Sequence, residues 1–350
     1  MRTGKFVLLF FFLSTLASVT FAQTEEQSLV HWMSVEQADT LAKKQPKPIL
    51  IDVYTDWCGW CKHMMKTTFS HPTIANYINQ HFYPVRFNAE TSDTIEYQGK
   101  TYLNSGVGKR SKHSFSELIL KGKYSFPTIV YIDEKRNISP VPGYMNAKDI
   151  ESLLVFFAEK VHKTCPFDQW QKMYQCNYPK HYKEEIKKIP KEELPDTSGN
   201  IQWQDWDTAA ALSKKEKKPL FVYFYNAWNN AARITEGIVL RHKIIADLIN
   251  TYYIPLKINV FETEEISFMD QVYKPGVTGT PHTLARVLLQ QEPNYPVFVF
   301  INEKMQKLDE VHGFLPPAVL ENILTYFKEK TYRSKSYTQH LKDFKGKIKQ

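Results

Sequence analysis

The chain contains an internal repeat that restricts it to folds built from two similar units. Residues 32–88 recur at residues 203–259 without a gap, and 16 of these 57 positions are identical. A second block, residues 126–130, recurs at residues 295–299. In a chain of 350 residues, repeats of this length predict two domains with the same fold.

The first copy alternates between segments with strand patterns and segments with helix patterns. Ser34 and Gln37 form a capping pattern for a helix that runs to Lys44. Residues 49–54 form an apolar strand, and residues 147–160 close the unit as an amphipathic helix. The other predicted elements are helices over about 62–69, 73–80 and 114–120, strands over 82–87 and 128–132, and a hairpin over 94–103. The order β-α-β-α-β-β-α indicates an α/β fold.

Two cysteines lie at the step from the first strand into the next helix. The segment Cys58-Gly59-Trp60-Cys61 follows the strand closely and leads into the helix. A helix N-terminus carries free backbone N–H groups and a partial positive charge, so a thiolate at Cys58 is stabilised there and its pKa is expected to fall from ~8.5 to roughly 3.5–7.5. Cys61, three residues on, is placed to attack a mixed disulfide formed at Cys58. The pattern predicts dithiol–disulfide exchange.

These residues resemble the thioredoxin superfamily. The segment Trp57–Lys62 fits its W-C-G-x-C-K signature, Asp52 matches the buried strand aspartate, and Pro127 matches the proline whose cis peptide bond faces the active site. The dipeptide between the cysteines is Gly-Trp, whereas typical thioredoxins carry Gly-Pro. Because of this difference, reductase, oxidase and isomerase directions all stay open.

The resemblance implies a fold and a set of roles. Each copy is expected to be a thioredoxin-like α/β domain, in tandem with the other, with a mixed central sheet flanked by helices. Cys58 is then the attacking thiol, Cys61 the resolving thiol and Asp52 the proton acceptor. The residues expected to border the substrate groove are Trp57, Trp60, Phe126 and Pro127.

The alternative for the cysteine pair is that it forms half of a zinc site. A structural zinc site needs two more ligands besides Cys58 and Cys61. The remaining cysteines, Cys165 and Cys176, are not spaced as a second close pair, so no metal site is predicted. Because an even cysteine count suits an exported protein, we predict a structural disulfide between Cys165 and Cys176.

The apolar neighbours of Asp52 predict that it lies in a buried strand. Burial raises the pKa of a carboxyl group, which suits Asp52 to accept the proton of Cys61 during exchange. Arg86 stands where thioredoxins carry a lysine near that aspartate. It either moderates the pKa of Asp52 or points to solvent, and the sequence does not decide between the two.

The recurrence of aromatic residues separates the two tryptophans of the motif. Trp57 recurs as Trp228 in the second copy, which favours a packing role, whereas Trp60 does not recur, which favours a place at the catalytic surface. His63 is predicted to be an exposed helix residue.

The second copy keeps the fold pattern and loses the thiols. Its offset of 171 places Asn229 and Ala232 at the cysteine positions and Tyr223 at the position of Asp52. Tyr295-Pro296 still matches Phe126-Pro127. This copy is therefore predicted to be inactive, and it either binds a peptide non-covalently or braces the first copy.

The N-terminus has the pattern of a secretory signal. Arg2 and Lys5 precede an apolar run over residues 6–16, and Ala22 provides a small residue for cleavage before Gln23. The protein is therefore expected to be exported, to the periplasm or the medium, with no membrane span after cleavage. An uncleaved membrane anchor is the alternative.

The positive charge of the chain does not point to nucleic acid. The formal charge is +8, and removal of Arg2 and Lys5 leaves +6. Much of it lies in the linker and the tail, without interleaved aromatic residues, so solvated basic faces are expected. Residues 106–111 lack the glycine spacing of a phosphate-binding loop and are expected to form a flexible loop. The tail has apolar residues at helical spacing and is expected to dock on the second domain.

Together these patterns predict a thiol–disulfide oxidoreductase that acts on protein thiols and disulfides with a redox partner protein. No cofactor is expected, because electrons pass through the thiols themselves. The alternative is a non-enzymatic binding protein with a static Cys58–Cys61 disulfide. The predicted boundaries are a signal peptide at 1–22, a catalytic domain at 28–162, a linker at 163–199, an inactive domain at 200–331 and a basic tail at 332–350.

Overall fold

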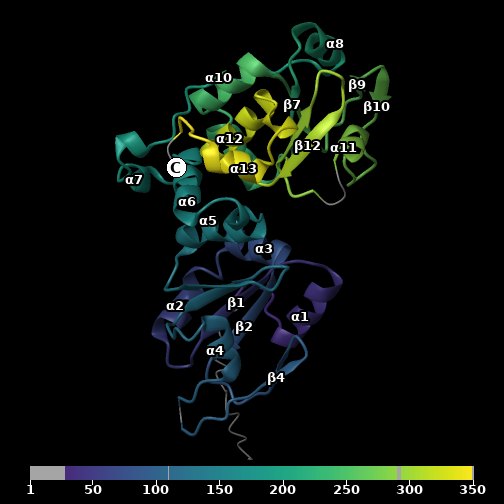
Figure 1. The fold of residues 1–350 in the computed structure, drawn as a ribbon. Helices are drawn as coiled ribbons and strands as arrows, with labels where there is room; N and C mark the ends of the chain where they lie inside the picture. The colour runs from purple at the N-terminus through teal and green to yellow at the C-terminus, as the bar shows by residue number, and fades with distance from the viewer. Residues whose placement is uncertain (1–27, 109, 290–292, 349–350) are drawn as a thin grey trace, which may run out of the picture.

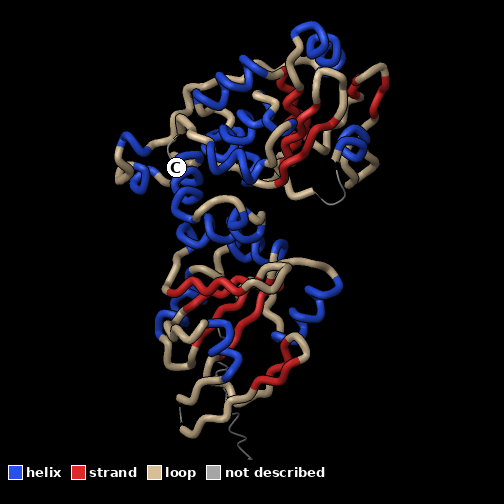
Figure 2. The backbone as a smooth tube through the Cα atoms, viewed as in Figure 1, coloured by secondary structure: helices blue, strands red, loops and turns tan. Residues whose placement is uncertain are grey.

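The computed structural model describes residues 28–108, 110–289 and 293–348, and it contains two modules stacked end to end (Figure 1). Each module has a four-stranded sheet with helices around it (Figure 2). The predicted signal peptide lies outside the described residues. Within the described part of the chain, no helix is both long enough and apolar enough to span a membrane.

The first module is built on the sheet β2-β1-β5-β6. Its central strand, β1 (Ile49–Tyr54), runs parallel to β2 (Tyr83–Asn88) and antiparallel to β5 (Thr128–Ile132), which pairs with the edge strand β6 (Ile138–Pro142). Because helices cover both faces of this mixed sheet, β1 and β5 are apolar and buried along nearly their whole length. The predicted mixed sheet is confirmed.

The helices of the first module begin and end close to the predicted residues. Helix α1 starts with a complete capping box. The hydroxyl of Ser34 accepts from the backbone N–H of Gln37, and the side-chain oxygen of Gln37 accepts from the backbone N–H of Ser34. The helices are α1 (Val35–Lys44), α2 (Gly59–Thr67), α3 (Pro72–His81), α4 (Ser114–Leu120) and α5 (Ala147–Ala158), and a small hairpin is formed by β3 (Ile95–Tyr97) and β4 (Lys100–Tyr102).

The second module repeats this architecture. Its sheet has the order β12-β11-β7-β8, and β7 (Leu220–Tyr225) and β8 (Ile254–Asn259) begin and end 171 residues after β1 and β2. The rest of the module comprises α8 (Trp206–Glu216), α9 (Asn230–Ile234), the π-helix η3 (Thr235–Val239), α10 (Lys243–Tyr252), β9 (Ile266–Phe268), β10 (Gln271–Tyr273), α11 (Thr283–Leu288), β11 (Val297–Ile301), β12 (Lys307–His312) and α12 (Pro317–Lys328). The expected tandem of two α/β domains, each with a mixed central sheet, is confirmed.

The segment between the modules is folded. After the short turn η1 (Val161–Lys163) it forms α6 (Phe167–Asn177), α7 (Lys183–Ile186) and η2 (Lys191–Glu193). The turn η4 (Thr331–Arg333) and helix α13 (Tyr337–Asp343) follow α12 in the second module. They begin 170 residues after η1 and α6, respectively. The turn and helix after the sheet are therefore part of the repeated unit.

The predicted disulfide between Cys165 and Cys176 is wrong. Both residues are free thiols, and they stand at opposite ends of α6. A helix rises ~1.5 Å per residue, which separates their Cα atoms by ~15 Å, whereas a disulfide needs Cα atoms roughly 4.4–6.8 Å apart. The sequence prediction failed because it treated this segment as an irregular linker.

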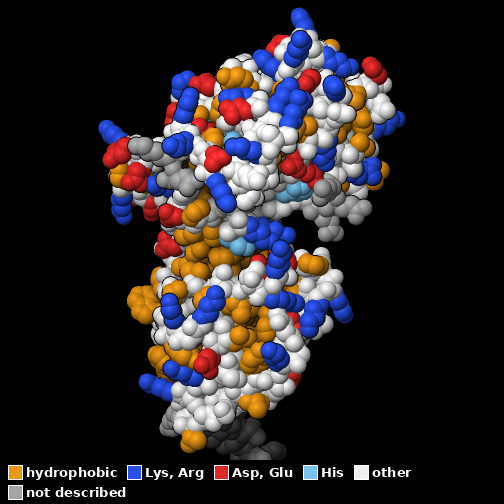
Figure 3. Space-filling model, in the orientation of Figure 1, with side chains coloured by type: hydrophobic (Ala, Val, Ile, Leu, Met, Phe, Trp, Pro, Cys, Tyr) orange, Lys and Arg blue, Asp and Glu red, His pale blue; other side chains and the backbone are white. Residues whose placement is uncertain are grey.

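A continuous apolar core joins the two modules. Trp170 of α6 is fully buried, donates its indole N–H to the carbonyl of Ser152 (2.9 Å), and contacts Phe314 of the second module edge to face. The same cluster contains Val155 and Phe156 of α5 together with core residues of β7. Apolar side chains are visible at this junction in the space-filling view (Figure 3). The junction therefore has the composition of a domain interior.

One buried carboxylate connects α5 to the second module. Glu159, the residue after α5, accepts from the backbone N–H groups of Asn230 (3.1 Å) and Ala231 (2.6 Å) in the first turn of α9. Tyr77 of α3 also donates its hydroxyl to Glu159 (3.2 Å). Burial raises the pKa of Glu159, and these hydrogen bonds lower it in part. The partial positive charge at a helix N-terminus stabilises a carboxylate, so the start of α9 favours the ionised form of Glu159.

We expect Glu159→Ala to destabilise the oxidised protein by ~3 kcal/mol, because it leaves several buried donors without an acceptor. Chemical denaturation, followed by fluorescence and circular dichroism, measures this loss. The matched control is Glu329→Ala, since Glu329 follows α12 at the same position of the repeat and its side chain is 53% exposed. The two variants should differ by at least ~2 kcal/mol. Equal effects would contradict a stabilising role for the contact.

Candidate active site

The motif lies where β1 leads into α2. Cys58 is the N-cap of α2, and the backbone N–H of Cys61 donates to the Sγ atom of Cys58 (3.1 Å). The two sulfur atoms form a disulfide, with Cα atoms 5.3 Å apart. The structure thus shows the oxidised form of the cysteine pair. The sulfur of Cys58 accepts a hydrogen bond at a helix N-terminus, and in the reduced form this arrangement stabilises a thiolate.

Both tryptophans of the motif are on the surface. Trp57 is 51% exposed and Trp60 is 61% exposed, whereas the two cysteine residues are buried, Cys58 with 5% of its surface accessible. The packing role predicted for Trp57 from its recurrence is therefore wrong, because Trp228 at the repeat position is exposed as well. A recurrent aromatic residue marks a shared position in the fold, and that position is at the surface.

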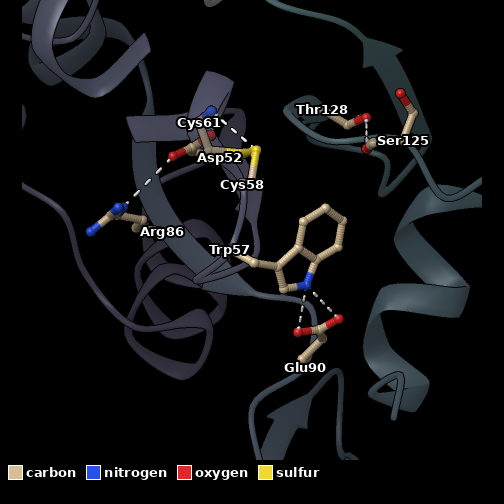
Figure 4. Close-up of a disulfide and its surroundings, with 8 residues drawn as sticks. All are labelled: Asp52, Trp57, Cys58, Cys61, Arg86, Glu90, Ser125 and Thr128. Carbon is tan, nitrogen blue, oxygen red and sulfur yellow. Dashed lines mark hydrogen bonds and ion pairs between the residues drawn. A yellow bond between two sulfur atoms is a disulfide. The ribbon is translucent and has the colours of Figure 1, made fainter. Parts of the chain in front are cut away.

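The segment that carries the expected proline contacts the motif through Phe126. The Phe126-Pro127 peptide bond is cis, and the ring of Phe126 meets the ring of Trp57 edge to face, with centroids 6.0 Å apart. Thr128 fixes this turn by donating its hydroxyl to the carbonyl of Ser125 (2.7 Å; Figure 4). Trp57 therefore contacts Phe126, the residue that precedes Pro127.

Asp52 is buried in the centre of β1, with 1% of its surface exposed. Neither carboxylate oxygen has a hydrogen-bond partner among the described residues. Desolvation raises the pKa of Asp52 to about 7, while Arg86, whose Nε atom lies 3.8 Å from the carboxylate, acts to lower it (Figure 4). The open question about Arg86 is thereby answered: its guanidinium faces Asp52 and covers the ring of Tyr54.

The second module indicates where the side chain at position 52 points. At the equivalent position Tyr223 is buried and donates its hydroxyl to the carbonyl of Ala232 (3.1 Å), the residue that replaces Cys61. Side chains at this place of the central strand therefore approach the residue at the resolving-cysteine position. A buried carboxyl that lacks a hydrogen-bond partner and has a pKa near neutral is typical of a proton-transfer group.

Two groups at the site were not found from the sequence. Trp57 donates its indole N–H to both carboxylate oxygens of Glu90, at 3.0 Å each (Figure 4). Tyr144 packs against the rings of Trp60 and His63, with centroid distances of 5.2 Å to each. Glu90 and Tyr144 stand in loops far from the motif in sequence, and no local pattern marks them.

The second module preserves the cap without the chemistry. Asn229 caps α9 by accepting from the N–H of Ala232 (2.8 Å), as Cys58 accepts from Cys61. The Tyr295-Pro296 bond is also cis. With no thiol at either position, this site has a hydrogen-bonding side chain and no nucleophile.

The site has the groups needed for thiol exchange. Among the residues that the structure describes, no group of three or more His, Cys, Asp and Glu side chains is arranged to hold a metal ion. The other two thiols lie at α6, where burial raises the pKa of Cys165 to about 12 and also raises the pKa of Cys176.

Comparison with protein families identifies the first module. Residues 35–158 match the model of a thioredoxin-like domain. The thiol:disulfide interchange protein DsbD of Pectobacterium atrosepticum is 26% identical over 128 residues, which are 36% of this chain and 19% of that protein. DsbD of Vibrio vulnificus is 40% identical over 62 residues, 17% of this chain and 10% of that protein. The matched part is thus a fifth or less of these relatives.

Solved structures also resemble parts of the chain. A thioredoxin from Thermus thermophilus is 19% identical and covers 36% of this chain and 86% of its own, with a TM-score of 0.28. The C-terminal domain of Neisseria meningitidis DsbD, in the reduced form, is 19% identical and covers 35% of this chain and 91% of its own, with a TM-score of 0.26.

Proposed function

We propose that this chain, in which residues 35–158 form a thioredoxin-like domain, is a thiol–disulfide oxidoreductase that acts on the disulfides of other proteins. The observation that carries the proposal is the Cys58–Cys61 disulfide at the N-terminus of α2, together with the buried carboxyl of Asp52 in the adjoining strand, which has no hydrogen-bond partner among the described residues. A binding protein needs neither a thiolate-stabilising helix end nor a carboxyl with a pKa of about 7 behind it.

The exchange follows from the positions of the three groups. In the reduced protein, the Cys58 thiolate attacks one sulfur of a substrate disulfide, and the other substrate sulfur leaves as a thiolate. Cys61 then loses its proton to Asp52 and attacks Cys58, which releases the second substrate sulfur and forms the Cys58–Cys61 disulfide. Two electrons pass to the substrate, whose two thiolates become thiols by taking up protons.

Several features of the wider function belong to this proposal. The relatives named as thiol:disulfide interchange proteins support a role in exchange with protein thiols and disulfides. We place the chain in an exported compartment, where a redox partner protein restores the active oxidation state of Cys58 and Cys61. No cofactor enters the electron path. The same steps run backwards if the partner is an oxidant.

We further propose that the second module braces the first. The fully buried Trp170, its contact with Phe314, and the bonds of Glu159 to the start of α9 support this role. The division into a catalytic domain at 28–162 and an inactive domain at 200–331 is part of the same proposal. Because the core is continuous, the isolated first domain would expose this surface, so tests are best done on the whole chain.

Insulin reduction tests the function directly. The full-length protein, reduced by dithiothreitol, should accelerate the precipitation of insulin chains well above the rate with dithiothreitol alone. The double variant Cys58→Ser/Cys61→Ser should give only the background rate. If wild type and double variant are equal, and the Cys58–Cys61 disulfide resists reduction by millimolar dithiothreitol, the static binding protein is the correct alternative.

A further inference from the structure

A groove leads away from the motif along the segment that precedes the cis proline. One cavity of about 320 Å³ opens between Trp57 and Phe126. A second, of about 440 Å³, continues to Pro140 on the edge strand β6. The two cavities share Tyr124 and Ser125 as lining residues, so they adjoin each other, and the first is lined by Trp57, the residue before Cys58.

Four cations line this groove. Arg110 and Lys112 belong to the first cavity, and Lys121 and Lys123 belong to the second. All four are exposed, and none forms an ion pair with a residue that the structure describes. The guanidinium of Arg110 lies over the ring of Trp57 at 4.9 Å, which places its charge directly at the motif.

Acidic groups do not balance these charges. Glu90 is the one carboxylate among the described residues that line either cavity, and it accepts the indole N–H of Trp57. Glu117 on α4 precedes Lys121 by four residues but forms no ion pair with it among the described contacts. The groove therefore carries a net positive charge next to Cys58.

The inactive module shows that the fold does not require these cations. An offset of 169 places His113, which caps α4, on His282, which caps α11 in the same way. The same offset brings Phe126 onto Tyr295, so the repeat is in register on both sides. At this offset the four cations fall on Gly279, Pro281, Gln290 and Glu292. The four cations therefore accompany the thiols in the sequence, and the corresponding positions of the second copy carry no basic residue.

We infer that the groove binds an acidic segment of the protein substrate, on one side of the cysteine that reacts with Cys58. This inference rests on the proposed exchange activity and names the class of substrate. Charge complementarity at an open groove mainly increases the association rate and fixes the direction of the bound segment. Tyr124 and Phe126 provide apolar contacts between the cations, so alternating acidic and apolar residues fit the lining.

Three synthetic peptides test the inference with the whole reduced protein. Each carries one cysteine in a mixed disulfide with 2-mercaptoethanol, and they differ only in four residues beside it, which are Glu, Gln or Lys. Stopped-flow fluorescence of the motif tryptophans measures the second-order rate of reduction. At low salt the Glu peptide should react about tenfold faster than the Gln peptide, and the Lys peptide more slowly than both. In 0.5 M NaCl the three rates should converge.

Charge variants locate the effect. Lys121→Gln/Lys123→Gln should lower the ratio of the Glu rate to the Gln rate about threefold, and Arg110→Gln/Lys112→Gln should do the same. The matched control is Lys214→Gln/Lys215→Gln on α8, an equal charge change at exposed residues of the second module. The control should keep the wild-type ratio. If the groove variants and the control behave alike, or the Glu peptide has no advantage, the inference is wrong.

Binding separates this inference from the proposed activity. Fluorescence anisotropy of the same peptides with serine in place of cysteine reports on the groove of the oxidised protein and needs no exchange. If no peptide is reduced but the Glu peptide binds the protein best, the exchange activity fails and the groove stands. If the Gln peptide is reduced but the Glu peptide neither binds nor reacts better, the activity stands and the groove is overturned.

Discussion

Cys58→Ser is expected to abolish protein disulfide reduction, with a loss of at least ~10³-fold, because a hydroxyl at the helix N-terminus is not ionised at neutral pH and cannot attack a disulfide. Insulin reduction by the full-length variant measures this. Cys61→Ser should fail differently: Cys58 still attacks, but the mixed disulfide is not resolved and accumulates as a covalent adduct. Non-reducing electrophoresis with mass spectrometry identifies the adduct.

The free thiols of α6 provide the control for both variants. Cys165→Ser and Cys176→Ser leave the motif intact, and full activity is expected from the second of these because Cys176 is only partly buried. Alkylation of the reduced protein at pH 6 should label Cys58 first and Cys165 last, since burial raises the pKa of Cys165 to about 12. Equal labelling of Cys58 and Cys61 would contradict the assigned roles of attacking and resolving thiol.

The elements of the first module were predictable because local signals and burial agree along most of its chain. The capping box of Ser34 starts α1, the apolar run 49–54 is the buried strand β1, and the cysteine motif caps α2. The repeat then transferred these elements to the second module, where β7 and β8 lie at the same offset. A fold can be predicted from one sequence where helix caps, apolar patterns and burial all indicate the same elements.

What escaped prediction depends on contacts between distant segments. Helix α6 lies in a segment that was expected to be a linker, and Trp170 is fully buried there because it contacts Ser152 of α5 and Phe314 of the second module. The recurrence of Trp57 favoured a packing role, although this residue lies on the surface and donates a hydrogen bond to Glu90, 33 residues away. Exposure and long-range pairing are properties of the assembled fold, so neither recurrence nor spacing reveals them.

Asp52→Asn is expected to stabilise the oxidised protein strongly above neutral pH. The pKa of Asp52 is raised from 3.8 to about 7 in the folded state, so the folded chain holds a proton that the unfolded chain has already lost. The stabilisation that the folded protein gains from holding this proton is therefore fully present below pH 3.8 and is lost as the pH rises through about 7. Over that window the ionisation of Asp52 costs ~4 kcal/mol of folding stability.

The test is the pH dependence of unfolding. The difference in unfolding free energy between Asp52→Asn and wild type should grow in favour of the variant by ~4 kcal/mol between pH 4 and pH 8. Asp247→Asn, which changes an exposed carboxylate on α10, is the control and should shift stability by less than ~0.5 kcal/mol at either pH. A pH-independent difference would mean that Asp52 is already ionised in the folded protein at pH 4.

The same variant should be slow, which separates the catalytic role of Asp52 from its effect on stability. Without the carboxylate, Cys61 loses its proton to water, and the resolving step should fall by ~10²-fold near pH 7. Because hydroxide takes over at higher pH, the rate of Asp52→Asn should approach that of wild type by about pH 9, close to the ordinary thiol pKa. A rate that is low at every pH would indicate distorted geometry, and an unchanged rate at pH 7 would remove Asp52 from the proton path. The Asp52→Asn protein should therefore be both more stable and slower than wild type, and both differences should depend on pH. Only a buried proton acceptor near Cys61 produces this combination.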